Sequence, residues 1–323
     1  SRCQREGRGF DPLCPLQNIV IKSKFITKTF QNFVKDKDIR VFKRSFLYYI
    51  IFRIVRNFLE NDIIINIYSF KIFGSIKKNN TSYFLLKKCE FGDNHEFDTI
   101  LRFSKNEKVF LLDCGCNYGF YTFYVASLSE KNYVVSIEAS KKTADKFLRN
   151  MDLNNLDNIS FFNKAISSED NVEVVLNESI NDWESSLTHD NFDTSSKEKI
   201  KTSKIDTLIK PFELKNYTLF IKLDIEGNEM GALKGAHKTI KDFSPIIIIE
   251  FSKFIFDKKK NIDYLYDFLN NYEYQIYDTN KNEVQMNEVI FKINKLTKRH
   301  KTIGNYYLIK KNSKQLKIFK KND

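Results

Sequence analysis

The sequence predicts an α/β fold built around a mostly parallel sheet that ends in an antiparallel edge strand. Two observations lead to this fold class. Short apolar runs recur along the chain and alternate with segments of helical periodicity, which is typical of βαβ units. The first run breaks into a glycine-containing turn, LLDCGCNYGFYT at 111–122, and an apolar helix follows at once. A sheet of this kind is covered by helices on both faces.

We expect three segments along the chain. Residues 1–17 are rich in Arg, Gly, Pro and Cys, unlike the rest, and are predicted to be non-native or disordered. Residues 18–95 are predicted to form an N-terminal accessory segment, and residues 96–323 the main domain. Within the accessory segment a helical pattern extends to about residue 59, and antiparallel strands are expected over 63–86.

The helical pattern near 40–58 combines apolar residues with Arg and Lys. Two interpretations remain open for it. It is either a helical layer with a solvated basic face or a helix that lies on a membrane surface. No run in the chain approaches the roughly 20 apolar residues of a membrane span. We therefore expect a cytoplasmic protein, with peripheral contact to the inner membrane surface as the further alternative.

The main domain is predicted from regular alternation of elements. Strands are expected at 109–112, 133–137, 159–163, 218–223 and 246–251. Helices are expected near 119–128, 141–154, 229–241 and 262–271. Between the third and fourth strands lies a polar excursion that reaches about residue 200. Two late strands, at 274–277 and 306–309, are predicted to form the antiparallel edge.

Composition limits the classes of function. The formal net charge of +12 suits nucleic acid or a membrane surface, but the lysines are scattered and interleaved with acids, which argues against a nucleic-acid footprint. The five cysteines are odd in number, and Cys114 and Cys116 lie inside the glycine turn. A disulfide framework is therefore not expected, and a reducing compartment is favoured.

The glycine turn itself is best explained by elimination. A dinucleotide fingerprint that starts at Gly115 requires glycines where this chain has Asn117 and Phe120, and no P-loop Lys-Ser/Thr follows. Asp113 would repel a pyrophosphate but attract a cofactor that carries positive charge, such as S-adenosylmethionine. Gly115 and Gly119 allow the backbone to approach a ligand closely, and the Asn117 side chain can form a hydrogen bond. An ordinary tight turn between strand and helix is the competing interpretation.

The next two strands end in further candidate cofactor ligands. Glu138 ends the second strand, where a carboxylate can accept both ribose hydroxyls of an adenosine. Asn163 ends the third strand and is predicted to read the adenine edge. Ala165 is small enough to line the ring.

Three carboxylates are predicted to meet at the same edge of the sheet. Asp224 and Glu226 follow the fourth strand, and Glu250 lies at the tip of the fifth. Like charges gathered on one rim repel one another, so a purely structural role would be costly. The set therefore favours chemistry, although any one of the three can instead cap a helix or pair with Lys.

These motifs together resemble the FkbM methyltransferases, within the Rossmann-like, S-adenosylmethionine-dependent class I enzymes. The resemblance covers about 96–309. It rests on LLDCGCNYGFYT, SIEAS, NNLDNISFFNKAIS, WESSL, SKIDTL, IKLDIEGNEMGALKGA and PIIIIEF, in that order. It implies O-methylation of a hydroxyl on a sugar, a polysaccharide precursor or a secondary metabolite. Cys116 departs from the alanine usual in the family, but a thiol is small enough to fit there.

Methyl transfer to an alcohol requires alignment and the removal of one proton. Asp224 is the first choice for that proton, with Glu226 and Glu250 as partners or hydroxyl ligands. We predict no bound metal, although Mg²⁺ held by these three carboxylates is an alternative that the ligand types permit. Trp183 is a candidate for stacking on a sugar face or for packing within its loop.

Two other functions stay open. One is ribose 2'-O-methylation of RNA, which Lys222 and Asp224 do not exclude. The other is a non-catalytic protein that binds the cofactor or associates with a membrane as a scaffold. DNA amino-methylation is excluded, because it requires two adjacent prolines after the fourth strand and no two prolines of this chain are adjacent. Oligomeric state cannot be inferred.

Overall fold

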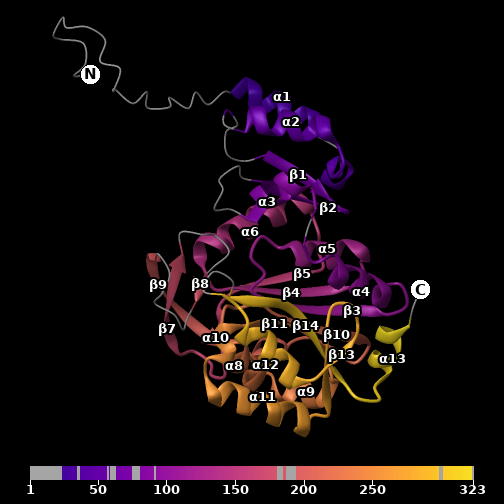
Figure 1. The fold of residues 1–323 in the computed structure, drawn as a ribbon, viewed down its shortest axis with the longest axis vertical. Helices are drawn as coiled ribbons and strands as arrows, with labels where there is room; N and C mark the ends of the chain where they lie inside the picture. Colours follow the sequence, from indigo (N-terminus) through magenta and orange to yellow (C-terminus); the bar gives the residue numbers. More distant parts are fainter. Residues whose placement is uncertain are drawn as a thin grey trace, which may run out of the picture.

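The structure is a computed structural model. It describes residues 24–34, 37–56, 58, 63–74, 81–90, 92–179, 185–186, 194–297 and 301–321. The predictions for residues 1–17 and for Trp183 lie outside the described residues. Figure 1 shows a small N-terminal lobe above a larger α/β body.

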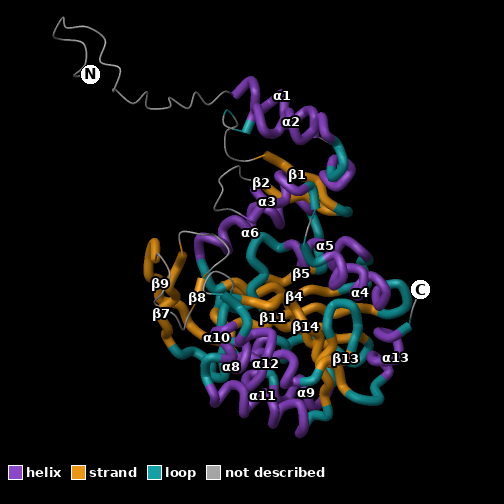
Figure 2. The backbone as a smooth tube through the Cα atoms, in the orientation of Figure 1, coloured by secondary structure: helices purple, strands orange, loops and turns teal. Residues whose placement is uncertain are grey.

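The main sheet has eight strands, and helices cover both of its faces (Figures 1 and 2). In spatial order the strands are β13 (Glu283–Val284), β12 (Tyr274–Tyr277), β14 (Thr302–Lys310), β11 (Ile246–Ser252), β10 (Tyr217–Leu223), β3 (Lys108–Cys114), β4 (Tyr133–Glu138) and β5 (Ile159–Asn163). The five strands from β11 to β5 are parallel, whereas β14 runs antiparallel to both β11 and β12. The predicted fold class, a Rossmann-like, mostly parallel sheet with an antiparallel edge, is confirmed.

The pleat of each central strand divides its side chains between two cores. In β3, Val109 and Leu111 pack on one face, while Phe110 and Leu112 pack on the other. The first face is covered by α4 (Asn94–Ser104), α5 (Phe120–Leu128), α6 (Lys141–Asn154) and α13 (Lys314–Lys320). The second is covered by α7 (Ile205–Leu208), α8 (Glu229–Gly235), α9 (His237–Phe243), α10 (Lys253–Phe256), α11 (Lys259–Asn271) and α12 (Met286–Asn294). Burial on both faces explains why these strands read as continuous apolar runs.

The N-terminal lobe consists of helices and a β-hairpin, and the hairpin strand β2 packs on α5 and α6. Its elements are α1 (Lys24–Val34), the 3-10 helix η1 (Ile39–Phe42), α2 (Phe46–Val55), β1 (Ile63–Ile67), β2 (Phe70–Gly74) and α3 (Thr81–Lys88). Asn150 and Asn154 of α6 accept hydrogen bonds from backbone N–H groups on the outer edge of β2. The Phe73 N–H donates to Asn150 Oδ1 at 2.8 Å, and the Lys71 N–H donates to Asn154 Oδ1 at 2.7 Å. The edge strand is thereby tied to the main body.

Two details differ from the sequence prediction. The hairpin turn lies at Tyr68 and Ser69 rather than near 77–82, and residues 81–88 form helix α3 instead of a strand. Tyr68 adopts the left-handed conformation (φ 52°), a position that glycine or asparagine usually signals. The polar excursion before residue 200 is also more regular than expected. It carries a four-stranded sheet in the order β6 (Ala165–Ile166), β9 (Thr194–Ser203), β7 (Glu173–Ser179) and β8 (Ser185–Ser186).

Candidate active site

The glycine turn joins β3 to α5 and touches the ends of two neighbouring strands. Gly115 (φ +79°) and Gly119 (φ +88°) both adopt conformations that favour glycine. A Cβ atom on Gly115 would lie 1.9 Å from the carbonyl oxygen of Asp224, so no other residue fits there without a shift. The Gly115 N–H also donates to Ile137 O of β4 at 2.9 Å. The turn therefore holds the tips of β4 and β10 against its own backbone.

Asp113 lies buried at the end of β3 and lines the cavity beside the turn. Its Oδ2 accepts a hydrogen bond from Thr122 Oγ1 at 2.7 Å. Burial raises the pKa of Asp113, and the nearby ammonium of Lys222 opposes that shift. Lys222 faces Asp113 directly in the register of β10 with β3.

Glu138 ends β4 and is held by two backbone donors. Its Oε2 accepts from the Asn117 N–H at 3.1 Å, and its Oε1 accepts from the Ser140 N–H at 2.9 Å. Burial raises the pKa of Glu138 to about 7, although these backbone bonds oppose the shift. A carboxylate has about four acceptor sites, so each oxygen can still receive a hydroxyl. Glu138 and Asn117 both line the cavity.

The two candidates at the third strand differ in position. Ala165 lines the cavity, together with the neighbouring Lys164. Asn163 does not line it, and its Nδ2 donates to the carbonyl oxygens of Glu138 (2.8 Å) and Ala139 (3.1 Å). In this geometry Asn163 holds the end of β4 that carries Glu138, and its role as an adenine ligand stays a prediction. Gly119 is also outside the lining, where it is the N-cap of α5.

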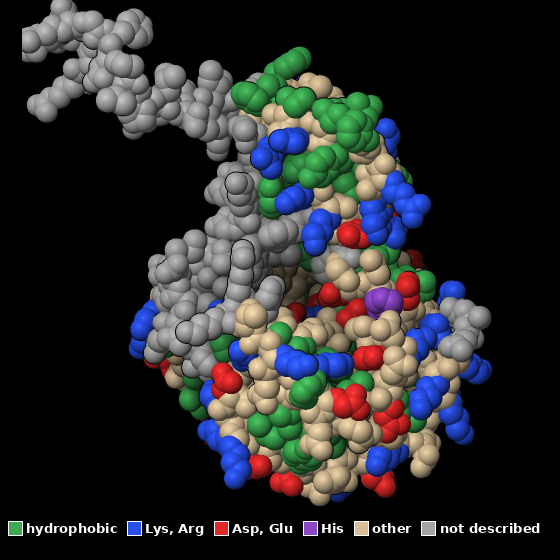
Figure 3. Space-filling view, in the orientation of Figure 1, with side chains coloured by type: hydrophobic (Ala, Val, Ile, Leu, Met, Phe, Trp, Pro, Cys, Tyr) green, Lys and Arg blue, Asp and Glu red, His purple; other side chains and the backbone are tan. Residues whose placement is uncertain are grey.

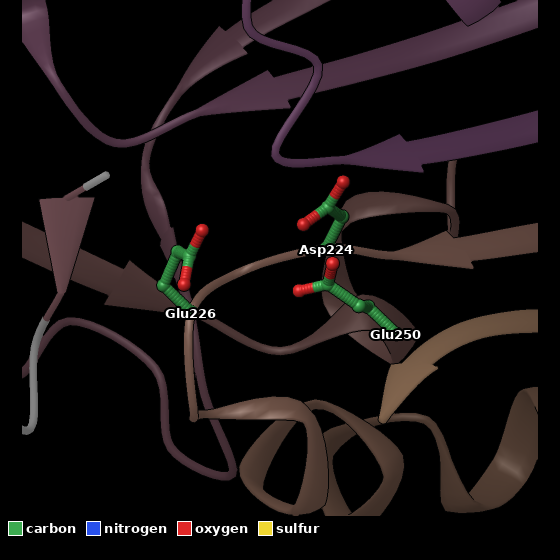
Figure 4. Close-up of side chains that lie close together, drawn as sticks. All are labelled: Asp224, Glu226 and Glu250. Carbon is green, nitrogen blue, oxygen red and sulfur yellow. The ribbon is translucent and has the colours of Figure 1, made fainter. Parts of the chain in front are cut away.

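The three predicted carboxylates do converge. One oxygen from each of Asp224, Glu226 and Glu250 lies within 4.8 Å of the others (Figure 4). Asp224 and Glu226 follow β10, where Glu226 adopts a left-handed conformation (φ 51°) that is uncommon for a residue with a side chain. Glu250 comes from β11, next to an irregularity in its pairing with β14. Burial and the charge of Asp224 raise the pKa of Glu250 to about 8.

Lys222 places a cation beneath this cluster. Its side chain is only 3% exposed, and its Nζ lies 2.6 Å from Asp224 Oδ2 and 4.7 Å from the ring centre of Tyr121. Burial alone would lower the pKa of Lys222, but Asp224, Asp113 and Asp93 outweigh it and raise that pKa above its usual range. The sequence analysis names Lys222 only beside Asp224 and gives it no role as the central cation of the site. A lysine inside an apolar strand gives no sign of the carboxylates around it.

Asp93 is a site residue that the sequence analysis missed. It lines the cavity from the segment before α4, and its Oδ2 accepts a hydrogen bond from Tyr121 Oη at 2.8 Å. Burial raises the pKa of Asp93, while Lys222 and Tyr121 oppose that rise. In the sequence an aspartate just before a helix is ordinarily read as a helix cap. Here its side chain forms no cap hydrogen bond.

Together these groups enclose a cavity of about 290 Å³ at the carboxyl edge of the sheet. In open α/β sheets this edge is where ligands bind. The residues present fit S-adenosylmethionine, since the turn allows close approach, Glu138 has free acceptor capacity and the lining contains six acidic residues against two lysines. The three clustered carboxylates also match the oxygen ligands of Mg²⁺, but the ammonium of Lys222 already occupies one side of Asp224.

The sheet order, with the cavity at its carboxyl edge, is that of the Rossmann-like class I methyltransferase fold. The methyltransferase FkbM domain matches residues 113–276, which is just over half of the chain, so the chain belongs to the FkbM methyltransferase family. The predicted family is thereby confirmed, as is S-adenosylmethionine as the cofactor. No curated protein sequence matches the chain.

Several solved structures are similar in part. The FkbM methyltransferase from Methylobacillus flagellatus KT is 20% identical, with a TM-score of 0.39, and the match covers 69% of this chain and 52% of that one. The O-methyltransferase from Bacillus cereus in complex with SAH is 16% identical, with a TM-score of 0.40, and the match covers 69% and 83%. M. jannaschii TYW2 in complex with AdoMet is 15% identical, with a TM-score of 0.37, and the match covers 77% and 84%. The chain thus spans about half the length of the M. flagellatus protein.

Proposed function

We propose that the protein is an S-adenosylmethionine-dependent O-methyltransferase that acts on a hydroxyl of a sugar, a polysaccharide precursor or a secondary metabolite. The observation that carries this proposal is the convergence of Asp224, Glu226 and Glu250 next to the glycine turn. Several carboxyl oxygens within 4.8 Å of one another suit an acceptor with neighbouring hydroxyls, each of which donates one hydrogen bond.

The cofactor supplies an electrophilic methyl group on a sulfonium. In the proposed site Glu138 accepts the two ribose hydroxyls through the acceptor sites that Asn117 and Ser140 leave free. Asp113 lends negative charge to the end of the cavity near the turn, where a sulfonium and an ammonium are favoured. Gly115 and Asn117 line the cavity at the turn, and the small side chain of Ala165 leaves room for the flat adenine ring.

We assign the acceptor proton to Asp224. Its carboxylate takes the proton of the attacking hydroxyl as the oxygen–methyl bond forms, at or after the transition state. The ammonium of Lys222 at 2.6 Å orients the Asp224 carboxylate and balances the charge of the rim. Burial and the charge of Asp224 raise the pKa of Glu250 and so favour its protonated form, which can donate one hydrogen bond to the acceptor as well as accept one. Glu226 serves as a further hydroxyl ligand.

The decisive experiment is single-turnover methyl transfer to a glycan-type acceptor with saturating cofactor, for the parent and Asp224→Asn. Asparagine keeps the volume and one acceptor oxygen but removes the basicity. The rate should fall by roughly 10² to 10⁴, because general bases contribute that much, while cofactor affinity is retained. Asp242→Asn, on the exposed side of α9, is the matched control and should react at the parent rate.

Two results would change the assignment. A parent rate for Asp224→Asn means that Asp224 is not the base. Loss of parent activity with a chelator means that a divalent cation, held by the same three carboxylates, is required. RNA as the acceptor is disfavoured because the carboxylates of the rim repel phosphates. An RNA substrate in the same assay tests this directly, and faster transfer to RNA than to the glycan would reverse the order of the two functions.

A further inference from the structure

Helix α2 in the N-terminal lobe presents an apolar face to solvent. Successive residues of a helix are turned by about 100°, so positions 46, 50 and 54 share one side. Phe46, Ile50 and Ile54 on that side are 79%, 38% and 61% exposed. The opposite side carries Tyr48 and Phe52, which are buried in the aromatic core of the lobe. The helix therefore carries apolar residues on both sides, and only the side with Tyr48 and Phe52 is covered.

The exposed apolar residues are concentrated in this part of the chain. Of the thirteen exposed large hydrophobic residues among those the structure describes, eight lie between residues 25 and 58. They are Phe25, Val41, Phe46, Leu47, Tyr49, Ile50, Ile54 and Phe58. Figure 3 shows hydrophobic side chains gathered at the top of the molecule, over α1 and α2. We call these eight residues the α2 patch. Single exposed apolar side chains are ordinary, but a gathered set of this kind marks an interaction surface.

The charge around the α2 patch indicates what it contacts. Residues 24–58 contain nine Lys or Arg and two Asp. Two of the cations are paired, Arg40 with Asp38 and Lys43 with Glu90. Arg44 and Arg53 are exposed and lie within or next to α2. Apolar residues that insert and cations beside them are the combination that binds a surface with anionic headgroups over a hydrocarbon interior.

We propose that the α2 patch docks the protein on the surface of an anionic lipid bilayer, with α2 lying in the plane of the interface. The ten residues of α2 are only about 15 Å long, half of the ~30 Å hydrocarbon core. Within the described part of the chain no helix has the length and apolar character of a membrane span. This docking is independent of the proposed methyl transfer.

The test is co-sedimentation of the full chain with vesicles of phosphatidylcholine alone or mixed with phosphatidylserine. The parent should bind the phosphatidylserine vesicles and lose that binding as salt is raised. Phe46→Gln/Ile50→Gln/Ile54→Gln should weaken binding by at least about tenfold, because the inserted apolar groups are lost. Arg44→Gln/Arg53→Gln should weaken it by roughly 25-fold, since each of the two cations near an anionic surface contributes roughly a factor of five.

The matched control is Leu148→Gln/Tyr266→Gln/Phe291→Gln. It changes three exposed apolar residues on helices of the main body and should bind vesicles like the parent. An equal loss in the control, or no vesicle binding by the parent, would overturn the proposal. A dimer in light scattering that the α2 triple variant converts to a monomer, without vesicle binding, would assign the patch to a second copy of the chain. Circular dichroism checks that each variant is folded.

Discussion

Lys222 shows how one residue organises the charges of the site. A buried ammonium is costly unless it is paired, and here Asp224, Asp113 and Asp93 surround it. These three acids come from three separate parts of the chain, so the lysine links β10 to β3 and to the segment before α4. Without the cation, the acids of the cavity would repel one another and raise one another's pKa values.

Glu138 offers a direct test of cofactor binding. Each hydrogen bond to a charged group contributes roughly 1.5 to 3 kcal/mol, so Glu138→Gln should weaken S-adenosylmethionine binding by at least about tenfold in calorimetry. The exposed Glu130→Gln is the control and should bind like the parent. An unchanged dissociation constant for Glu138→Gln would remove Glu138 from the ribose site.

The pH dependence of binding tests the same carboxylate independently. With a pKa of about 7 in the free protein, Glu138 gains a proton as the pH falls below 7, and the protonated form is a poorer partner for two hydroxyl donors. Affinity for the cofactor should therefore decline from pH 8 to pH 6 in the parent. The decline should be smaller in Glu138→Gln, which has no proton to gain at that position. Equal slopes would show that another group titrates.

At the scale of elements, the turn between β3 and α5 positions the strand ends that form the cavity. It leaves the sheet at Cys114, contacts the backbone of Asp224 and hydrogen-bonds to the end of β4. Three strand tips are thus placed by one short loop. A change in that loop is expected to disturb the base and the ribose ligand together.

Gly115→Ala tests the close approach of this turn to the backbone of Asp224. The added Cβ would meet the Asp224 carbonyl oxygen at 1.9 Å, and the φ of +79° is itself unfavourable for alanine. We expect the free energy of unfolding to fall by more than about 1 kcal/mol in denaturant titrations, together with a loss of cofactor affinity. Gly92→Ala is the matched control, because its Cβ would meet nothing within 4 Å and its φ is not in the positive range. Equal stability of the two variants would contradict the close approach.

At the scale of the whole molecule, three carboxyl groups of the cavity region make stability depend on pH. Burial raises the pKa values of Glu138 and Glu229 to about 7 and that of Glu250 to about 8. In the unfolded chain these groups titrate near 4.5. A raised pKa in the folded state favours the protonated form, so this contribution to stability is full below pH 4.5 and is lost as the pH rises through 7 to 8.

The stability of the free protein should therefore decrease between pH 5 and pH 8 as these carboxyls ionise. Glu229→Gln isolates one of them, since glutamine resembles the protonated acid, and Glu229 Oε2 is buried with no hydrogen-bond partner among the described residues. We expect this variant to have a higher Tm than the parent at pH 8 and a flatter dependence of Tm on pH. The same slope in both proteins would mean that Glu229 titrates normally.

Much of the fold follows from local patterns. The predicted strands at 159–163 and 274–277 and the helix at 141–154 have the same bounds in the structure. Buried parallel strands and amphipathic helices produce apolar patterns among residues that are close in sequence, so hydrophobic periodicity detects them. The small sheet that contains β7 and β9 was not predicted. Its strands are polar and are held mainly by pairing with one another, which periodicity does not report.

The sequence alone determined the family, the glycine turn and the convergence of Asp224, Glu226 and Glu250, because the carboxyl ends of parallel strands meet at one edge. Only the tertiary structure decided which further residues join them. Asp93 lines the cavity, although it comes from the segment predicted to belong to the accessory part. The expected boundary between the accessory segment and the main domain at residue 95 stays a prediction. Lys222 becomes the central cation only because β3 pairs beside β10 and brings Asp113 opposite it. Such contacts join residues distant in sequence, and no local pattern encodes them.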